Sequence, residues 1–351
     1  MSYYKKIENI YRNIIKFSYP PQILYQDYRN NKKYKKSEKK FLVVRHGYYN
    51  PWRYNIILDW IEQNLPEVRQ YFELHQFPCR ITDWSKYILH VPWLQDPVQQ
   101  WSMRAYNQSC KISRQCDELN IPIINRVENL TNATKSNGAR IIGSTGIRTP
   151  KVVKITDLNT FKKDLGGLEL PLIIRDDWGH QGTILLIESI NQLNNISLKG
   201  ITRPIAIEYI NTQSEDGLYR KYRYTLAGEI GIPQSMHIRK IWLVRGNKTE
   251  KSDALFNEEI NYLIQPDPNH SKLLEASKAL KLDFVAFDYS YDKEGKLIVW
   301  EANPYPYLHI PGEIRKYRRP ATEKTLAEIT RMYLEKAGLD VNPKLDKLTN
   351  T

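Results

Sequence analysis

The stretch VAFDYSYDKEGKLIVWEANPYP, residues 285–306, contains two apolar runs separated by the polar turn DKEG. This arrangement predicts a β-hairpin. Asp288 lies in the first strand, whereas Glu301 and Asn303 end the second. In such a hairpin Asp288 and Glu301 fall close to each other across the strands. Glu301 and Asn303, two residues apart, face the same side of their strand.

Two carboxylates and an amide in this arrangement provide the hard oxygen ligands that Mg²⁺ prefers. A magnesium ion held in this way usually also binds phosphate oxygens of a nucleotide. Charged residues of a hairpin can equally lie on its solvated face, and the spacing alone leaves both interpretations open.

The pattern D-x12-E-x-N-P formed by these residues resembles the signature of the ATP-grasp superfamily, in which a strand reading E-x-N ends the nucleotide-binding domain. Four further segments resemble that superfamily in the same order along residues 130–305. They are TKSNGARIIGSTGIRTP (134–150), PLIIRDDWGHQG (171–182), IAIEYI (205–210) and YRKYR (219–223). Lys135 precedes Pro150 by fifteen residues, as in the ribosomal-protein glutamate ligases, and the overall type is similar to these enzymes and to glutathione synthetase.

The resemblance implies an α/β (α+β) fold of the ATP-grasp type, with the nucleotide held between two α+β domains after an N-terminal parallel α/β domain. We therefore expect a basic N-terminal arm at 1–40, a pre-ATP-grasp domain at 41–128, a central domain at 129–212, a C-terminal nucleotide and metal domain at 213–340, and a tail at 341–351.

The resemblance also implies roles for individual residues. Asp288, Glu301 and Asn303 correspond to the metal ligands for one or two Mg²⁺ ions, with Mn²⁺ as an alternative. The expected ATP-binding residues are Lys135, Arg175, Gly179, His180, Gln181, Gly182, Glu208, Tyr209 and Ile210. The expected catalytic cation is Arg223, with Arg220 or Lys221 as substitutes.

Two features of the glycine loop depart from the family pattern. Arg175 stands where most relatives have lysine, and a guanidinium can still bind phosphate because it is permanently charged and bidentate. Asp176 and Asp177 stand beside the expected phosphate site, where they could contact the metal indirectly or meet a cationic substrate. The sequence leaves both roles open.

Candidate substrate residues come from two other places. Tyr305, Tyr307 and His309 follow the metal strand, where relatives place residues that bind the acceptor. Arg104 lies in the helix after a strand of the first domain, where it could meet a carboxylate because ligands collect at strand carboxyl ends in open sheets.

The function that this pattern favours is an ATP-dependent ligase that joins a carboxylate to an amine through an acyl phosphate and releases ADP and phosphate. The substrates would be small molecules or peptides, and the chain could form a homo-oligomer. One alternative is a phosphotransferase on the same scaffold. Another is a non-catalytic protein that binds nucleic acid or another anion.

The net charge of +13 resides mainly in the N-terminal segment. Residues 1–40 contain eleven lysines and arginines and three acidic residues. Such a segment is either a solvated, partly disordered arm or an electrostatic arm for an anionic partner. The N-terminus lacks the apolar core of a signal peptide, and no apolar run reaches the roughly 20 residues that span a bilayer. With three cysteines that lack paired spacing, we expect a cytoplasmic protein.

The first domain shows alternating strand and helix patterns. Apolar runs predict strands at 39–47, 86–93 and 121–127, whereas amphipathic stretches predict helices at 52–72 and 99–120. Strands that alternate with helices are typical of a parallel α/β layer.

Overall fold

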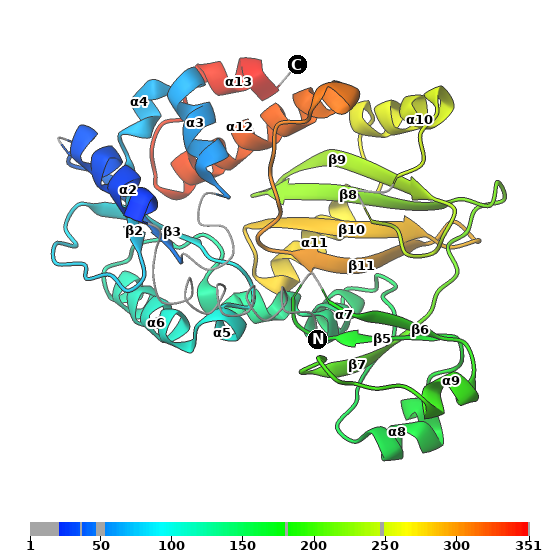
Figure 1. The fold of residues 1–351 in the computed structure, drawn as a ribbon. Coiled ribbons are helices and arrows are strands. Elements are labelled where there is room, and N and C mark those ends of the chain that lie inside the picture. The colour runs from blue at the N-terminus through cyan, green and yellow to red at the C-terminus, as the bar shows by residue number, and fades with distance from the viewer. Residues whose placement is uncertain (1–20, 36, 47–52, 180–181, 246–248, 350–351) are drawn as a thin grey trace. The chain divides into compact units, whose positions relative to one another are not determined.

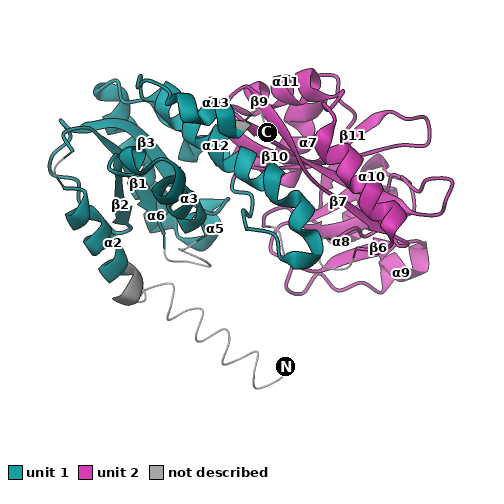
Figure 2. Ribbon diagram, turned by 90° about the horizontal axis from the view of Figure 1, so that it is seen from above, with its two compact units in different colours: residues 1–130, 305–351 teal, residues 131–304 magenta. Residues whose placement is uncertain are grey.

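A computed structural model describes residues 21–35, 37–46, 53–179, 182–245 and 249–349 of the chain (Figure 1). The chain divides into two compact units (Figure 2). Unit 1 comprises residues 1–130 and 305–351, and unit 2 comprises residues 131–304. The finer domain boundaries expected at 41, 129, 213 and 341 stay predictions.

Unit 1 contains a three-stranded parallel sheet in the order β2-β1-β3. Its strands are β1 (Lys40–Arg45), β2 (Phe72–Gln76) and β3 (Tyr87–Trp93). Every residue of the central strand β1 is buried. This explains its nearly continuous apolar sequence, because a central parallel strand is covered on both faces.

The prediction of a third strand at 121–127 was wrong. Of this stretch only Ile123 forms a bridge, to His90, and the backbone of Asn125 has a φ of 46°. The third strand is β2, which begins at the end of the stretch predicted as one helix. That stretch forms α3 (Asn55–Asn64) and the short α4 (Pro66–Arg69), because Pro66 starts a new helix after Leu65.

The remaining helices of unit 1 lie within residues 21–133 and within residues 313–349. Tyr333 packs against the sheet, and its hydroxyl accepts a hydrogen bond of 3.2 Å from the indole of Trp93. These helices are α2 (Pro21–Lys33), α5 (Val98–Trp101), α6 (Met103–Glu118), η4 (Glu313–Arg318), α12 (Arg319–Lys336) and α13 (Pro343–Thr349), and η1 (Val127–Ala133) spans the boundary between the units.

Helix α2 is part of the folded unit, although its sequence belongs to the segment expected to be an arm. Its Asn31 side chain donates to the carbonyl oxygen of Leu74 at 2.8 Å and accepts from the backbone N–H of Leu74 at 2.9 Å. Asp27 of α2 is buried and forms an ion pair with Arg45. The helix therefore covers the edge strand β2.

Unit 2 contains two four-stranded antiparallel sheets. One has the order β4-β7-β5-β6 and the other β11-β10-β8-β9. The strands of the first sheet are β4 (Val152–Lys154), β5 (Leu172–Asp176), β6 (Ile184–Ile187) and β7 (Pro204–Glu208). Those of the second are β8 (Tyr219–Ala227), β9 (Ile230–Arg239), β10 (Phe284–Tyr291) and β11 (Leu297–Asn303). The predicted hairpin is thus the β10–β11 pair.

Helices cover the sheets of unit 2. Phe161 and Leu193 from two of them pack against Leu172 and Ile174 of β5 in the core of the first sheet. The helices are α7 (Lys135–Gly143), α8 (Leu158–Asp164), η2 (Leu165–Gly167), α9 (Ile190–Asn194), α10 (Asp253–Ile264) and α11 (His270–Leu280).

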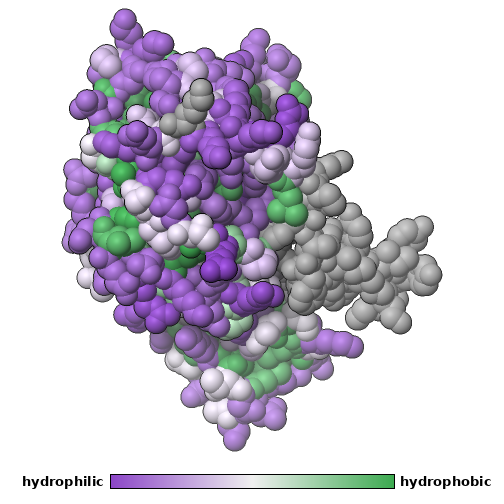
Figure 3. Space-filling model, turned by 90° about the vertical axis from the view of Figure 1, so that its left-hand side faces the viewer, coloured by the Kyte–Doolittle hydropathy of each residue, from purple (hydrophilic) through white to green (hydrophobic). Residues whose placement is uncertain are grey.

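The hydrophilic character of the surface is what the charged composition of the chain predicts. The face shown in Figure 3 is covered mainly by hydrophilic residues, with hydrophobic residues in small separate groups. Over the described residues, no helix combines the length and the apolar character that crossing a bilayer requires.

Candidate functional site

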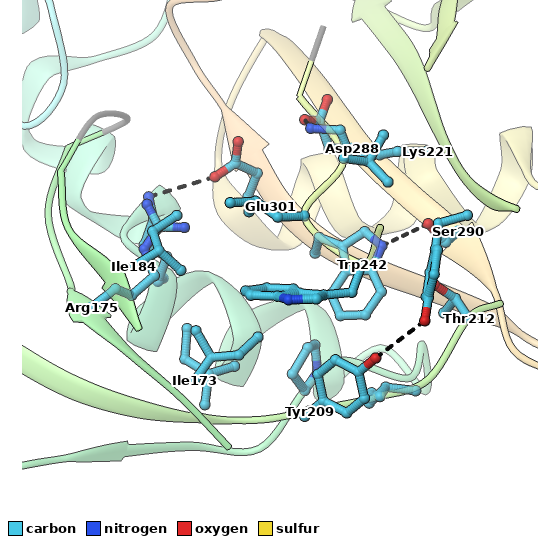
Figure 4. A pocket seen from close by; sticks show the side chains of 18 residues that line it. Ile173, Arg175, Ile184, Tyr209, Thr212, Lys221, Trp242, Asp288, Ser290 and Glu301 are labelled. Carbon is cyan, nitrogen blue, oxygen red and sulfur yellow. Dashed lines mark hydrogen bonds and ion pairs between the residues drawn. The ribbon is translucent and has the colours of Figure 1, made fainter. Parts of the chain in front are cut away.

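A cavity lies between the two sheets of unit 2 and contains about 910 Å³ of empty space, part of it open to solvent (Figure 4). Residues of β5, β6 and β7 contribute to its lining from one sheet, and residues of β8, β10 and β11 contribute from the other. The cavity has an apolar part and a charged part.

The apolar part is rich in aromatic residues. Trp242 stands in the middle of the view in Figure 4, and its ring meets that of Tyr209 edge to face at 6.0 Å. The indole of Trp300 donates to the Ser290 hydroxyl at 2.8 Å. Aromatic and aliphatic walls of this kind suit a flat heterocycle. The other apolar and aromatic lining residues are Pro150, Ile173, Ile184, Ile207, Ile210, Tyr219, Leu243 and Val244.

A β-bulge explains how Trp300 and Glu301, which are neighbours in sequence, both line the cavity. Asp288 pairs with Glu301, but the next pair is Tyr289 with Val299, so Trp300 is an additional residue in β11. Without a bulge, consecutive side chains would point to opposite faces. The bulge therefore places a carboxylate and an aromatic ring on one side of the hairpin.

Three cations line the charged part: Lys135, Arg175 and Lys221. The Nζ of Lys135 donates to the carbonyl oxygen of Gly179 at 2.8 Å and lies 3.5 Å from a carboxylate oxygen of Glu301. Arg175 is different, because its Nε is buried and has no hydrogen-bond acceptor among the residues that the structure describes. Burial lowers the pKa of Arg175, and the nearby charge of Glu301 opposes this effect.

Asp288 is buried among cations. Its carboxylate accepts hydrogen bonds from Lys221 at 2.7 Å and from Arg223 at 2.7 and 3.1 Å. Burial alone would raise the pKa of Asp288, but the charges and hydrogen bonds of Arg223 and Lys221 hold it well below its usual range. Asp288 is therefore ionised at neutral pH.

The three basic residues that the sequence predicts as candidate catalytic cations lie on strand β8, but their side chains have different partners. Lys221 and Arg223 lie on the face that meets Asp288. Arg220 forms ion pairs with Asp216 at 2.6 Å and Glu258 at 2.5 Å, and it does not line the cavity. Alternation along the strand thus separates Arg220 from the other two.

The loop after β5 joins this site to helix α7. Gly179 and Gly182 have φ values of 84° and 155°, which favour glycine. His180 and Gln181 lie outside the described residues. Lys135 begins α7, and its side chain bonds to Gly179 in this loop. The loop thereby holds the first cation of the site.

The carboxylates of Asp176 and Asp177 hold this loop in place through hydrogen bonds to nearby groups. The Asp177 carboxylate accepts from the backbone N–H of Ser136 at 2.8 Å and from its hydroxyl at 2.7 Å, so it caps the N-terminus of α7. Asp176 accepts from the backbone N–H groups of Trp178 and Thr202 at 3.1 and 2.7 Å. These hydrogen bonds give both acids a structural role that the sequence did not reveal.

The segment after β7 contributes Tyr209 and Ile210 to the lining, whereas Glu208 does not line the cavity. The Glu208 carboxylate accepts from the backbone N–H of Lys151 at 2.9 Å and lies 3.7 Å from Arg148. In this structure Glu208 thus connects β7 to the chain before β4.

The three candidate metal ligands lie on the paired strands β10 and β11. Asn303 is buried and pairs with Ala286, two positions along the strand from Glu301. No group of three or more histidine, cysteine or acidic side chains in the described part of the chain could hold a metal ion. The candidate site has two carboxylates and an amide, and these hard oxygen donors fit a magnesium ion that also binds phosphate.

The candidate substrate residues Tyr305, Tyr307, His309 and Arg104 belong to unit 1. Arg104 is exposed on α6, and the rings of Tyr307 and His309 stack at 5.1 Å. Their roles toward a substrate stay predictions.

The sequence did not identify several of the lining residues. Tyr219 could have been found, because it lies two residues before Lys221 and so shares its face of β8. Ser290 is likewise two residues after Asp288. Trp242 lies in an irregular segment after β9, where no periodic pattern indicates its position. Thr212 also lines the cavity.

No known protein-family model matches the chain, and no curated protein sequence matches it. Solved structures do resemble it in fold. The D-Ala:D-Ser ligase VanG from Enterococcus faecalis has a TM-score of 0.55 at 14% identity, covering 85% of this chain and 99% of that one. The D-alanine–D-alanine ligase from Bacillus anthracis complexed with ATP has a TM-score of 0.52 at 13% identity, covering 85% and 96%.

A third structure carries the name of the fold. It is a RimK domain protein, ATP-grasp, from Sphaerobacter thermophilus, with a TM-score of 0.50 at 11% identity, covering 83% of this chain and 99% of that one. Similarity at such identities is evidence about the fold, and it agrees with the two facing sheets of unit 2 and the parallel sheet of unit 1. The chain has the ATP-grasp fold.

Proposed function

We propose that this protein is an ATP-dependent ligase that joins a carboxylate to an amine. The observation that carries the proposal is the division of a single cavity into an aromatic, apolar part and a part with three cations beside two carboxylates. A nucleoside triphosphate has the same division, because its base is flat and aromatic and its phosphates are anionic. The ATP-grasp fold supports this assignment.

The nucleotide would lie with its base against Tyr209, Ile210 and Trp242. Its phosphates would then meet Lys135, Arg175 and the backbone N–H groups of the loop around Gly179 and Gly182. The buried Nε of Arg175 has no acceptor in the described part of the chain, so a phosphate oxygen would satisfy a donor that is otherwise costly to bury. Glu208 would contact the nucleotide on its ribose side.

Asp288, Glu301 and Asn303 would hold one or two Mg²⁺ ions, which when bound supply positive charge to the terminal phosphates. Lys221 and Arg223 now neutralise Asp288. Phosphate oxygens would offer these two cations other partners, and Asp288 would then be available to a metal ion.

The proposed reaction has two displacement steps. A substrate carboxylate oxygen attacks the γ-phosphorus, the bond to the β,γ-bridging oxygen breaks, and ADP leaves. An amine nitrogen then attacks the acyl carbon, the bond to the phosphate oxygen breaks, and inorganic phosphate leaves with loss of a proton from nitrogen. Arg223 and Lys221 would stabilise the charge on the transferred phosphoryl group.

Product analysis tests the proposal. We expect ADP and phosphate to be released only when a carboxylate and an amine are both present, in a panel of carboxylic and amino acids. Release of AMP and pyrophosphate would contradict the proposal. A stable phosphorylated product without any need for an amine would favour the phosphotransferase alternative.

The first prediction concerns the candidate metal ligands. Glu301→Ala and Asn303→Ala are each expected to abolish ATP turnover, because each removes an oxygen donor for the metal, while the circular dichroism spectrum stays that of the wild type. Glu294→Ala is the matched control, since Glu294 is exposed in the turn of the same hairpin. Normal turnover in both site variants would defeat this assignment.

A further inference from the structure

Asp177 lies in a place where electrostatics alone would not favour an acid. It follows Arg175, one of the cations that line the proposed nucleotide cavity, by two residues. A carboxylate beside an anion-binding site weakens the binding of the anion, because like charges repel each other. Asp177 is nevertheless buried, so its side chain is held in one place. Its hydrogen bonds indicate what the acid does there.

Asp177 binds the first two backbone N–H groups of helix α7. The N–H of Lys135 donates to the Asp177 carbonyl oxygen at 3.3 Å, and the N–H of Ser136 donates to the carboxylate at 2.8 Å. The Ser136 hydroxyl donates to the other carboxylate oxygen at 2.7 Å. The helix also has a local cap, because the Thr134 hydroxyl accepts from the third N–H, that of Asn137, at 3.4 Å. Asp177 therefore adds a connection between α7 and a segment that is distant in sequence.

The same end of α7 carries a cation of the cavity. The ammonium group of Lys135 donates to the carbonyl oxygen of Gly179 at 2.8 Å and lies 3.5 Å from a carboxylate oxygen of Glu301. Asp177 and Gly179 belong to one loop, so this loop binds Lys135 both at its backbone N–H and at its ammonium group. The charge of Asp177 is offset in part, because its carboxylate binds the positive end of the α7 dipole.

We propose that Asp177 is a positioning residue, which holds the first turn of α7 against the loop so that the ammonium group of Lys135 meets the phosphates of a nucleotide. This inference rests on the proposed function, because it takes a nucleotide as the ligand of the cavity. It predicts a sign that repulsion between charges does not. Removal of the acid should weaken the binding of a triphosphate, whereas repulsion alone would make its binding stronger.

The experiment is titration calorimetry of the full chain with a non-hydrolysable ATP analogue and Mg²⁺. Asp177→Ala should weaken binding at least about ten-fold, as loss of hydrogen bonds to a charged group would. Asp177→Asn should weaken it less, because the amide oxygen can still accept one hydrogen bond from Ser136. Glu169→Gln is the control, since it removes the same charge from an exposed position of unit 2 and should leave the affinity unchanged.

A double-mutant cycle tests whether Asp177 acts through Lys135. Lys135→Ala should weaken binding of the analogue by itself, and Asp177→Ala should then cause little further loss in the Lys135→Ala background. Two residues that act independently would instead give losses that add. Adenosine provides a second measurement, because it lacks phosphates and would contact only the aromatic part of the cavity. Its affinity should be the same in the wild type and in Asp177→Ala.

If Asp177→Ala fails to fold, Ser136→Ala decides, because it removes only the hydroxyl partner of the carboxylate. It should weaken binding of the analogue about three-fold to ten-fold and leave that of adenosine unchanged. The role of Asp177 is overturned if the alanine variant that folds binds the analogue as tightly as the wild type, if adenosine binding weakens equally, or if the losses in the cycle add. A wild-type protein that does not bind the analogue would overturn the nucleotide cavity as well, whereas binding without ligase turnover would contradict only the ligase.

Discussion

Arg175 and Asp288 show two ways of keeping a charge in the same cavity. The carboxylate of Asp288 forms ion pairs with two cations of the protein, Lys221 and Arg223. Arg175 keeps a buried Nε for which no described residue provides an acceptor. Because a buried unsatisfied donor costs about 1–3 kcal/mol, a ligand anion that accepts from Arg175 gains much of its affinity there.

The second prediction follows from this difference. Arg175→Gln should weaken binding of a non-hydrolysable ATP analogue with Mg²⁺ by about ten-fold to a hundred-fold, and Arg175→Lys by less. Titration calorimetry measures both. Arg140→Gln is the control, because Arg140 is exposed on helix α7 of the same unit. Equal affinity of wild type and Arg175→Gln would remove Arg175 from the phosphate site.

The third prediction concerns Glu73 of β2 and the dependence of stability on pH. Burial opposes its ionisation, yet hydrogen bonds from His75, Lys86 and Tyr87 lower the pKa of Glu73 to about 2. A lowered pKa means that the ionised carboxylate stabilises the fold above its unfolded pKa of about 4.5, and this stabilisation disappears as the pH falls toward 2.

Glu73→Gln should therefore lower the free energy of unfolding by about 1–3 kcal/mol at pH 7. The difference from the wild type should shrink progressively below pH 5, as urea unfolding at several pH values would show. Glu38→Gln, at an exposed position of the same unit, should change neither the free energy of unfolding at pH 7 nor its dependence on pH. A pH-independent difference would show that the charge of Glu73 is not its cause.

At the scale of elements, β2 is an edge strand whose free side is covered by a helix. Asn31 of α2 bonds to both backbone groups of Leu74, which is the pairing that another strand would offer. Open edges invite pairing with other chains, so natural proteins protect them. The positive charge of this segment is thus carried partly by a helix that belongs to the fold.

The fourth prediction tests this cover. Asn31→Ala should lower the free energy of unfolding by about 1–3 kcal/mol, because two backbone groups of β2 lose their partner. It should also increase aggregation on mild heating, measured by light scattering. Gln26→Ala, on the exposed side of α2, is the control. If Asn31→Ala has the unfolding free energy and the aggregation of the wild type, the hydrogen bonds of Asn31 do not stabilise the edge strand β2.

At the scale of the whole molecule, the lining residues of the proposed nucleotide cavity all belong to unit 2. A ligand that binds only the folded state stabilises it, by about 2.7 kcal/mol at a concentration of one hundred times its Kd. A bound nucleotide should therefore protect unit 2.

The fifth prediction is a pattern of hydrogen exchange. ADP with Mg²⁺ should slow amide exchange most in strands β5, β6, β10 and β11 of unit 2, because these strands line the cavity. The Arg175→Gln variant at the same ligand concentration should show less protection. Protection confined to unit 1 would contradict the assignment of the nucleotide cavity.

The sequence by itself determined the β10–β11 hairpin and the order of the motifs around the cavity. The hairpin at 285–306 and the ATP-grasp fold are confirmed. Lys135, Arg175, Tyr209, Asp288 and Glu301 do line one cavity. The hairpin could be predicted because strand alternation and turn residues are properties of neighbouring positions in the chain. The fold and the other lining residues were implied by the resemblance to the ATP-grasp superfamily.

Only the tertiary structure decided which distant segments meet. It placed β2 instead of 121–127 in the parallel sheet, Trp242 in the cavity, and the guanidinium of Arg53 over the rings of Tyr305 and Tyr307. It also gave Asp177 to the N-terminus of α7. The physical reason is that sheet partners, cavity walls and ion pairs depend on long-range packing, whose free energy is shared among many residues and leaves no periodic trace in the sequence.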